Sequence, residues 1–131
     1  MSTLAERIDR RREIRAAYAE VFAEIPGTAL NPIGAGHEPN HWLTCVTIDP
    51  AEAGFSREEL RLHLEAANIE ARPLWKPMHL QPVFSDAPRR IDGTSEALFE
   101  IGLCLPSGSS MTHPDITRVT TTIAEFATSR R

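Results

Sequence analysis

The sequence has one lysine, two cysteines and few aromatic residues, and these scarcities exclude several kinds of protein. Among 131 residues, Lys76 is the only lysine, although lysine and arginine together number 14. Chemistry that needs a lysine amine must therefore use Lys76 or come from another chain. Cys45 and Cys104 are too few for a disulfide framework, and both lie within apolar runs. We expect two small buried thiols in a reducing compartment.

Long hydrophobic runs and an excess of positive charge are also missing. No apolar run approaches the ~18 residues of a membrane span, and the N-terminus lacks the charged-then-apolar order of a signal peptide. The net charge of -4 gives no general attraction to nucleic acid or anionic lipid. We therefore predict a cytoplasmic protein without nucleic-acid or membrane partners, folded as a single domain over residues 1–131.

The hydrophobic pattern of the first half predicts a long helix, a loop, a strand and a second helix. Apolar residues recur at helical spacing over about 3–24, and a breaker-rich loop follows over 26–40. Residues 41–49 are rich in β-branched and apolar side chains, which favours a strand. Ser56 and Glu59 fit a capping box, which predicts that a helix begins there. The apolar positions expected for this helix are Leu60, Leu62, Leu64 and Ala67.

The second half predicts short elements separated by one long loop. Pro73 bars the extended segment 69–75 from a central strand position, and residues 76–93 resemble a long loop. The remaining expected elements are a short helix over 95–101 that ends at Gly102, a strand over 103–106 and a final helix capped by Thr112. The resulting fold class is α/β, with a small sheet of about three strands covered by helices.

Two motif matches do not support a metal or phosphate site. His37–His41 reads H-E-x-x-H, but Pro39 would break the helix on which that zinc motif depends. The glycine-serine run before Thr112 lacks the Walker lysine, and a helix cap by Thr112 and Asp115 explains it. We predict no metal ligands, no cofactor-binding residues and no catalytic residues from these motifs.

The segment from Arg72 to His79 carries the most chemical information. Arginine and lysine bind phosphate oxygens, tryptophan stacks on planar bases, and histidine donates or accepts protons near neutral pH. Arg72, Trp75, Lys76 and His79 lie within eight residues that two prolines stiffen. The alternative is an edge segment in which Trp75 and Met78 pack in the core while the charges lie in water.

Several segments, in consistent order, resemble one family. Residues 69–84, which read IEARPLWKPMHLQPVF, closely resemble a segment of the DegT/DnrJ/StrS-type, pyridoxal-phosphate-dependent sugar aminotransferases. Residues 103–110 resemble the closing strand and turn of that family's small domain. Residues 11–18 resemble the helix that enters this domain, and residues 41–43 its first strand. The likeness covers most of the chain but only the C-terminal part of such an enzyme.

The resemblance implies a fold type I aminotransferase that transfers an amino group to a nucleotide-linked keto-sugar in polysaccharide or secondary-metabolite biosynthesis. It implies pyridoxal phosphate as the cofactor of the full-length enzyme, held by a lysine of a large domain that this chain lacks. The chain alone is therefore expected to bind no cofactor and to be inactive. Expected partners are the large domain, a second subunit and a nucleotide-sugar. The residues expected to face the substrate are Arg72, Trp75, Lys76 and His79.

Two other functions stay open from the sequence. The domain is alternatively a non-catalytic module that binds a nucleotide-sugar or a protein through residues 72–79. It is also compatible with a degenerate remnant, which would expose an apolar face where the large domain docks. Binding of nucleotide-sugars without cofactor distinguishes the module from the remnant.

Overall fold

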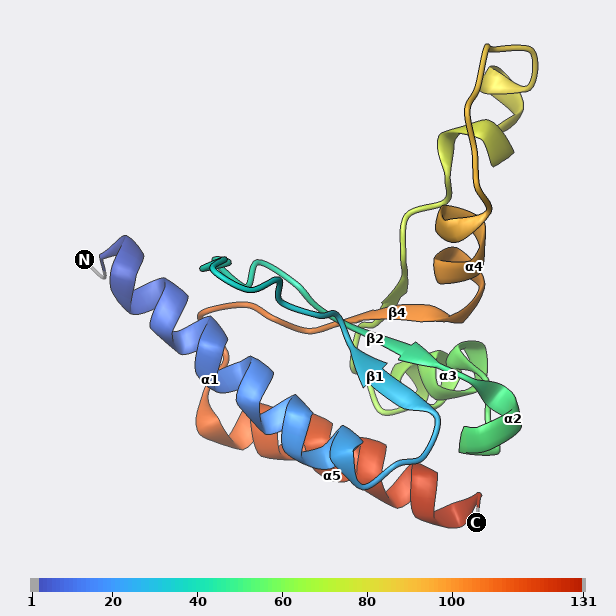
Figure 1. Cartoon of the computed structure of the whole chain (residues 1–131). Helices are drawn as coiled ribbons and strands as arrows, with labels where there is room; N and C mark the ends of the chain where they lie inside the picture. The colour runs from blue at the N-terminus through green and yellow to red at the C-terminus, as the bar shows by residue number, and fades with distance from the viewer. Residues whose placement is uncertain (1–2, 131) are drawn as a thin grey trace.

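The computed structural model describes residues 3–130 and confirms the α/β class (Figure 1). No helix in that range is both long and apolar enough to cross a bilayer. The described range contains five α-helices, four strands and two 3-10 turns. In order these are α1 (Leu4–Ala23), β1 (Thr28–Leu30), β2 (Thr44–Ile48), α2 (Pro50–Ala53), α3 (Arg57–Ala66), β3 (Arg72–Pro73), η1 (Met78–Leu80), η2 (Pro82–Phe84), α4 (Thr94–Ile101), β4 (Gly102–Leu105) and α5 (His113–Ser129).

The four strands form one antiparallel sheet in the order β1-β2-β4-β3. Strands β2 and β4 are central, and Cys45 lies opposite Cys104 in their register. The two-residue strand β3 pairs with β4 at the edge of the sheet, where Pro73 lies opposite Leu103. The edge position follows from Pro73, because proline has no amide hydrogen to donate to a second neighbour. The edge placement predicted for this segment is confirmed.

One face of the sheet supports the hydrophobic core, because side chains alternate between faces along each strand. Helices α1 and α5 lie side by side below that face, and α3 completes the cover (Figure 1). The core includes residues of the three helices and of both central strands: Ile14, Tyr18, Phe22, Val46, Ile48, Leu60, Leu64, Leu103, Leu105, Ile116, Val119, Ile123 and Phe126. The opposite face carries Cys45, Thr47, Gly102 and Cys104.

Side chains that cap helices determine where two of the predicted helices begin. The Ser56 hydroxyl accepts a hydrogen bond from the Glu59 amide, and the Glu59 carboxylate accepts one from the Ser56 amide. Thr112 and Asp115 form the same reciprocal pair before α5. These bonds satisfy amides that have no partner within the first helical turn. Both capping predictions are confirmed.

Four expectations from the sequence are wrong in detail. The predicted loop over 26–40 contains strand β1, so the sheet has four strands rather than about three. The short helix α2 between the predicted strand and Ser56 was not expected. Leu62, assigned to the apolar face of α3, is half exposed because Leu60 and Leu64 point to the core. Cys45 is partly exposed, whereas Cys104 is buried as expected.

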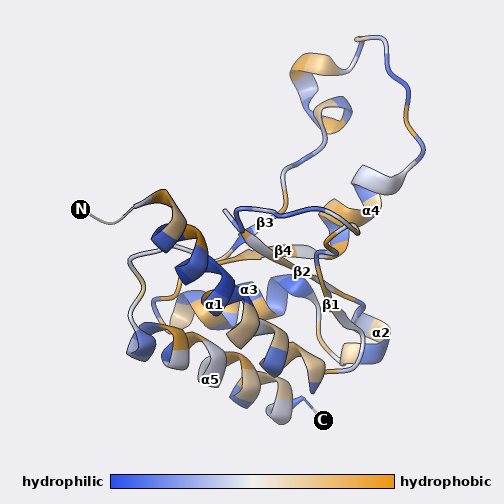
Figure 2. Cartoon of the chain, turned by 60° about the vertical axis from the view of Figure 1, so that its left-hand side comes forward, coloured by the Kyte–Doolittle hydropathy of each residue, from blue (hydrophilic) through white to orange (hydrophobic). Residues whose placement is uncertain are grey.

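Residues 76–93 form an arm that extends away from the rest of the molecule, with α4 at its base (Figures 1 and 2). The arm carries the two 3-10 turns and no longer element. Several of its apolar side chains are exposed: Met78, Leu80, Val83 and Ile91. None of the arm's residues belongs to the buried core cluster. The arm is therefore held by local contacts and by its connections to strand β3 at one end and to helix α4 at the other.

Gly102 allows the arm to return closely to the sheet. A Cβ atom at this position would lie 2.1 Å from Cδ1 of Leu74 and 2.5 Å from the carbonyl oxygen of Leu98. Only glycine therefore permits Leu74 to cover the start of β4 while α4 ends directly above it. The predicted stop of this helix at Gly102 is confirmed, and the same residue begins β4.

Candidate functional site

A hollow of about 690 Å³ lies on the face of the sheet opposite the core, beside the base of the arm. This volume falls within the range of small-molecule sites. The walls come from the two residues that precede β2, from β3 and the residues beside it, from α4, and from the end of β4 and the residues after it. Three of the four predicted substrate-facing residues line it: Arg72, Trp75 and Lys76.

Two exposed tryptophans form part of the rim of this hollow. The ring centroids of Trp42 and Trp75 are 6.3 Å apart, and the ring planes are tilted by 40°. The side chains are 62% and 66% exposed, so each ring keeps a face open to solvent. The alternative in which Trp75 and Met78 pack in the core is wrong, since Met78 is also 61% exposed. Rings in direct contact leave a planar ligand an outer face on which to stack.

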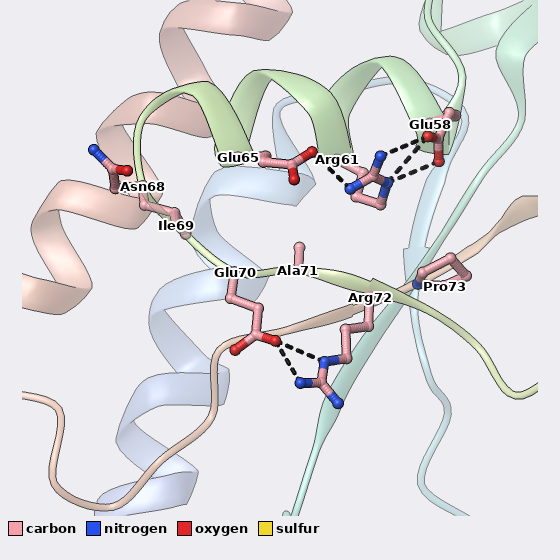
Figure 3. A pocket seen from close by; sticks show the side chains of 9 residues that line it. All are labelled: Glu58, Arg61, Glu65, Asn68, Ile69, Glu70, Ala71, Arg72 and Pro73. Carbon is pink, nitrogen blue, oxygen red and sulfur yellow. Dashed lines mark hydrogen bonds and ion pairs between the residues drawn. The ribbon is translucent and has the colours of Figure 1, made fainter.

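Arg72 lies where this hollow meets a second one, between α3 and β3 (Figure 3). The Nε and Nη2 groups of Arg72 donate to the same carboxylate oxygen of Glu70, at 2.8 and 2.5 Å. Nη1 makes no such bond with any residue from Thr3 to Arg130, so the guanidinium can still donate to an anion. Both side chains are well exposed, and water screens the pair. Glu70 therefore orients the Arg72 guanidinium and leaves some of its hydrogen-bond donors available to a ligand.

The second hollow is lined mainly by charged side chains, which pair either within α3 or, for Glu70 and Arg72, beside β3. Arg61 donates to Glu58 and to Glu65, one helical turn away on either side (Figure 3). These hydrogen bonds hold the pKa of the Glu58 carboxyl below its usual value. Each of the charged side chains that line this hollow has an oppositely charged partner within the described range 3–130, so this surface is less suited than the first hollow to bind a charged ligand.

Lys76 begins the arm and contributes the unpaired cation of the first hollow. Its amine makes no hydrogen bond or ion pair with any residue of the described range 3–130. Its carbonyl oxygen accepts a hydrogen bond from the Gln81 side chain at 3.1 Å, which fixes the backbone of the arm. A fixed backbone with a free amine is suited to binding phosphate oxygens as a point charge.

His79 lies apart from the other three predicted residues. Its Nε2 atom lies 2.5 Å from a carboxylate oxygen of Glu96 on α4, and its side chain is only 11% exposed. This contact joins the arm to the helix at its base. Its position makes His79 a residue that supports the arm, and a direct contact with substrate stays a prediction.

Several lining residues were missed by sequence reasoning. Trp42 was assigned only to the start of a strand, and its approach to Trp75 depends on pairing between distant strands. Phe99 and Cys104 also line the hollow. The H-E-x-x-H match lies outside any helix, as predicted, and residues 3–130 contain no cluster of three side chains suited to a metal. One signal in the sequence could have identified Trp42 as a lining residue: the chain contains two tryptophans, and both flank strand segments.

Comparison of the sequence and comparison of the structure with known proteins both lead to one family. Residues 1–124 match the model of the DegT/DnrJ/EryC1/StrS aminotransferase family. EpsN of Bacillus subtilis, named as a pyridoxal phosphate-dependent aminotransferase, is 39% identical over 123 residues, which are 91% of this chain and 31% of EpsN. GDP-perosamine synthase of Escherichia coli O157:H7 is 29% identical over 119 residues, with the same two coverages.

A solved structure shows the same arrangement of elements. DesI, crystallised with its TDP-sugar product, superposes with a TM-score of 0.78 at 31% identity, over 92% of this chain and 31% of DesI. The chain thus spans about a third of the length of the proteins that it matches. Since the family model covers nearly the whole sequence, the chain belongs to the DegT/DnrJ/EryC1/StrS aminotransferase family.

Proposed function

We propose that this chain forms the C-terminal, substrate-side domain of an aminotransferase that acts on nucleotide-linked keto-sugars, and that it is inactive alone. The observation that carries the proposal is the meeting of Arg72, Trp75 and Lys76 with Trp42 at one hollow. Two relatives support the substrate class by name, as a GDP-perosamine synthase and as a protein with a TDP-sugar product.

The hollow matches the chemistry of a nucleotide diphosphate. A planar base stacks on the open face of an exposed tryptophan ring, and base–aromatic stacking contributes about 1–3 kcal/mol. The amine of Lys76 and the free Nη1 of Arg72 lie on the same rim and carry the positive charge that phosphate oxygens need. In this proposal the domain binds the nucleotide and orients the sugar.

The residues of this chain do not fit pyridoxal phosphate. That cofactor needs a lysine amine held against its aldehyde and a partner for its pyridinium nitrogen. Lys76 lies exposed at the start of the arm, and no carboxylate of the described range 3–130 pairs with its amine. We therefore assign cofactor binding to a part of the enzyme outside this chain and derive no chemical step from the residues here.

The exposed arm supports the proposal of a larger assembly. Val83 is 80% exposed, and Met78 and Ile91 are more than half exposed, although all three are apolar. Exposed apolar side chains that gather on one segment mark a contact surface. We assign this surface to the large aminotransferase domain or to a second subunit, and the two pieces should then co-purify.

A titration with UDP-, GDP- and TDP-linked sugars tests the binding part of the proposal. We expect saturable binding by calorimetry without cofactor. The double variant Arg72→Ala, Trp75→Ala should bind at least about tenfold more weakly, because stacking and one phosphate contact are lost. Arg89→Ala, an exposed change on the distal arm, is the matched control and should bind as tightly as the parent chain. Absence of heat with all three nucleotides would contradict the proposal.

A second experiment tests whether the chain is inactive alone. Pyridoxal phosphate is added, the absorbance spectrum is followed, and borohydride is used to trap any adduct. We expect no stable adduct and no amination of a keto-sugar with glutamate as the donor. A trapped adduct at Lys76 together with turnover would overturn the assignment. If the chain binds nucleotide-sugars and no neighbouring gene encodes a large domain, the non-catalytic module would be favoured instead.

A further inference from the structure

The two cysteines lie directly opposite each other at the centre of the sheet. Cys45 of β2 is paired in register with Cys104 of β4, and their Sγ atoms are 3.6 Å apart. The residues are 59 positions apart in the sequence, so only the folded sheet brings them together. Neither thiol takes part in the proposed function.

The backbone around this pair matches the geometry that a cross-strand disulfide needs. The amide of Cys45 donates to the side-chain oxygen of Asn31, and its carbonyl accepts from the Asn31 amide. Both backbone groups of Cys45 therefore point away from β4, which makes Cys45 and Cys104 a non-hydrogen-bonded pair. In such pairs the Cα atoms are about 4.5 Å apart and the side chains approach closely. That separation lies within the range bridged by disulfides, so the bond requires little backbone movement.

The two thiols also differ in a way that suits disulfide exchange. Cys45 is partly exposed on the face opposite the core, whereas Cys104 is buried. A hydrogen bond between the two sulfurs holds the pKa of Cys45 below its usual value, and the same bond and burial raise the pKa of Cys104. The cysteine that is more exposed as a residue is thus the better thiolate, and its neighbour is placed to resolve an intermediate.

We propose that Cys45 and Cys104 form a redox-active dithiol that closes reversibly to a disulfide in the presence of a small-molecule disulfide such as oxidised glutathione. The Cys45 thiolate attacks one sulfur of the small disulfide, whose S–S bond breaks and releases one thiolate. Cys104 then loses its proton to solvent and attacks Cys45 Sγ, which releases the second small thiol. Two cysteine thiols are oxidised, and one disulfide is reduced to two thiols.

The dithiol lies next to the candidate binding site. Cys104 lines the same hollow as Trp75 and Lys76, and its backbone is paired with Arg72 of β3. A disulfide would join β2 covalently to the strand that supports this edge of the sheet. Formation of the disulfide would therefore depend on the redox state of the surroundings and would constrain β4, which pairs with the strand that carries Arg72.

Incubation of the reduced chain with oxidised glutathione tests the proposal. We expect both free thiols to disappear, the mass to fall by two hydrogen atoms, and dithiothreitol to reverse both changes. Non-reducing peptide mapping should recover one species that joins the Cys45 and Cys104 peptides. The reaction should be at least tenfold faster in the folded chain than in urea, where 59 positions separate the thiols without a sheet to align them.

Two serine variants separate the roles of the sulfurs. Cys104→Ser should stop at a glutathione adduct on Cys45, and Cys45→Ser should react at least tenfold more slowly than Cys104→Ser. Circular dichroism shows whether each variant keeps its fold. If a variant does not fold, peptide mapping of the parent chain tests the proposal in its place. A persistent glutathione adduct on the parent chain, a linked dimer, two unreacted thiols, or equal rates in urea would overturn the proposal.

Discussion

The Tyr18 side chain connects helix α1 to the segment that follows β4. It is fully buried, and its hydroxyl donates to the carbonyl oxygen of Pro106 at 2.8 Å. Burial raises the pKa of the Tyr18 phenol above its usual value, because the ionised form would lose its hydration. A single aromatic residue thus fills the core and satisfies a carbonyl that would otherwise lack a partner.

Replacement of this residue should reveal a dependence of stability on alkaline pH. The unfolded phenol ionises near pH 10, whereas the folded one stays protonated at higher pH. Its contribution is therefore complete below about pH 10 and is lost as the pH rises further. At pH 7, Tyr18→Phe should lower the free energy of unfolding by about 1 kcal/mol. Above pH 10 this gap, the difference in free energy of unfolding between the variant and the parent chain, should become smaller.

Urea unfolding at several pH values measures this gap, and phenolate absorbance reports the ionisation directly. Tyr18 is the only tyrosine, so the absorbance change belongs to one residue. Free tyrosinamide is the reference. A folded chain whose phenol titrates at the same pH as the reference would show that Tyr18 is accessible, contrary to its buried position.

At the scale of elements, the sequence predicted features that depend on nearby residues. The capping boxes at Ser56 and Thr112 were found because both partners lie within three positions. Strand β1 was missed because three residues in a breaker-rich loop become a strand only through pairing with β2. The contact between Trp42 and Trp75 and the pairing of the two cysteines were missed for the same reason. That Arg72, Trp75 and Lys76 lie together could be predicted because they fall within five residues of the sequence, and their role at a site stays a prediction.

The cap of helix α5 provides a direct test of one such local feature. Thr112→Ala removes the hydroxyl that accepts from the Asp115 amide and should lower the free energy of unfolding by about 1 kcal/mol. The hydrogen bonds from Thr112 hold the pKa of the Asp115 carboxyl below its usual value, so the variant should also raise that pKa. This carboxyl stabilises the fold above its unfolded pKa, and the contribution disappears as the pH falls through its folded value.

Thr121→Ala is the matched control in the same helix. Thr121 is exposed, and alanine is the better helix former. The free energy of unfolding of Thr121→Ala should therefore stay within about 0.5 kcal/mol of that of the parent chain. Urea unfolding of both variants and an NMR titration of Asp115 provide the comparison. Equal losses at the two positions would mean that the cap does not determine where α5 begins.

At the scale of the whole molecule, a packed body and a projecting arm differ in how they are stabilised. The body contains the whole buried core, whereas the arm over 76–93 contributes no residue to it. The contact between His79 Nε2 and the Glu96 carboxylate joins the arm to α4 at its base. Cleavage within the arm should therefore leave the body folded, because its strands pair independently of the arm's distal end.

Limited digestion with trypsin tests this division. Arg89 and Arg90 are exposed and lie outside any helix or strand, and Pro77 protects the bond after Lys76. We expect the first cut after Arg89 or Arg90, identified by mass spectrometry. The two pieces should co-elute from a sizing column, because β2 pairs with β4 and α1 packs on α5 across the cut. Arg89→Gln with Arg90→Gln should delay cleavage, whereas a first cut within α1 or separation of the pieces would show that the arm helps to hold the body together.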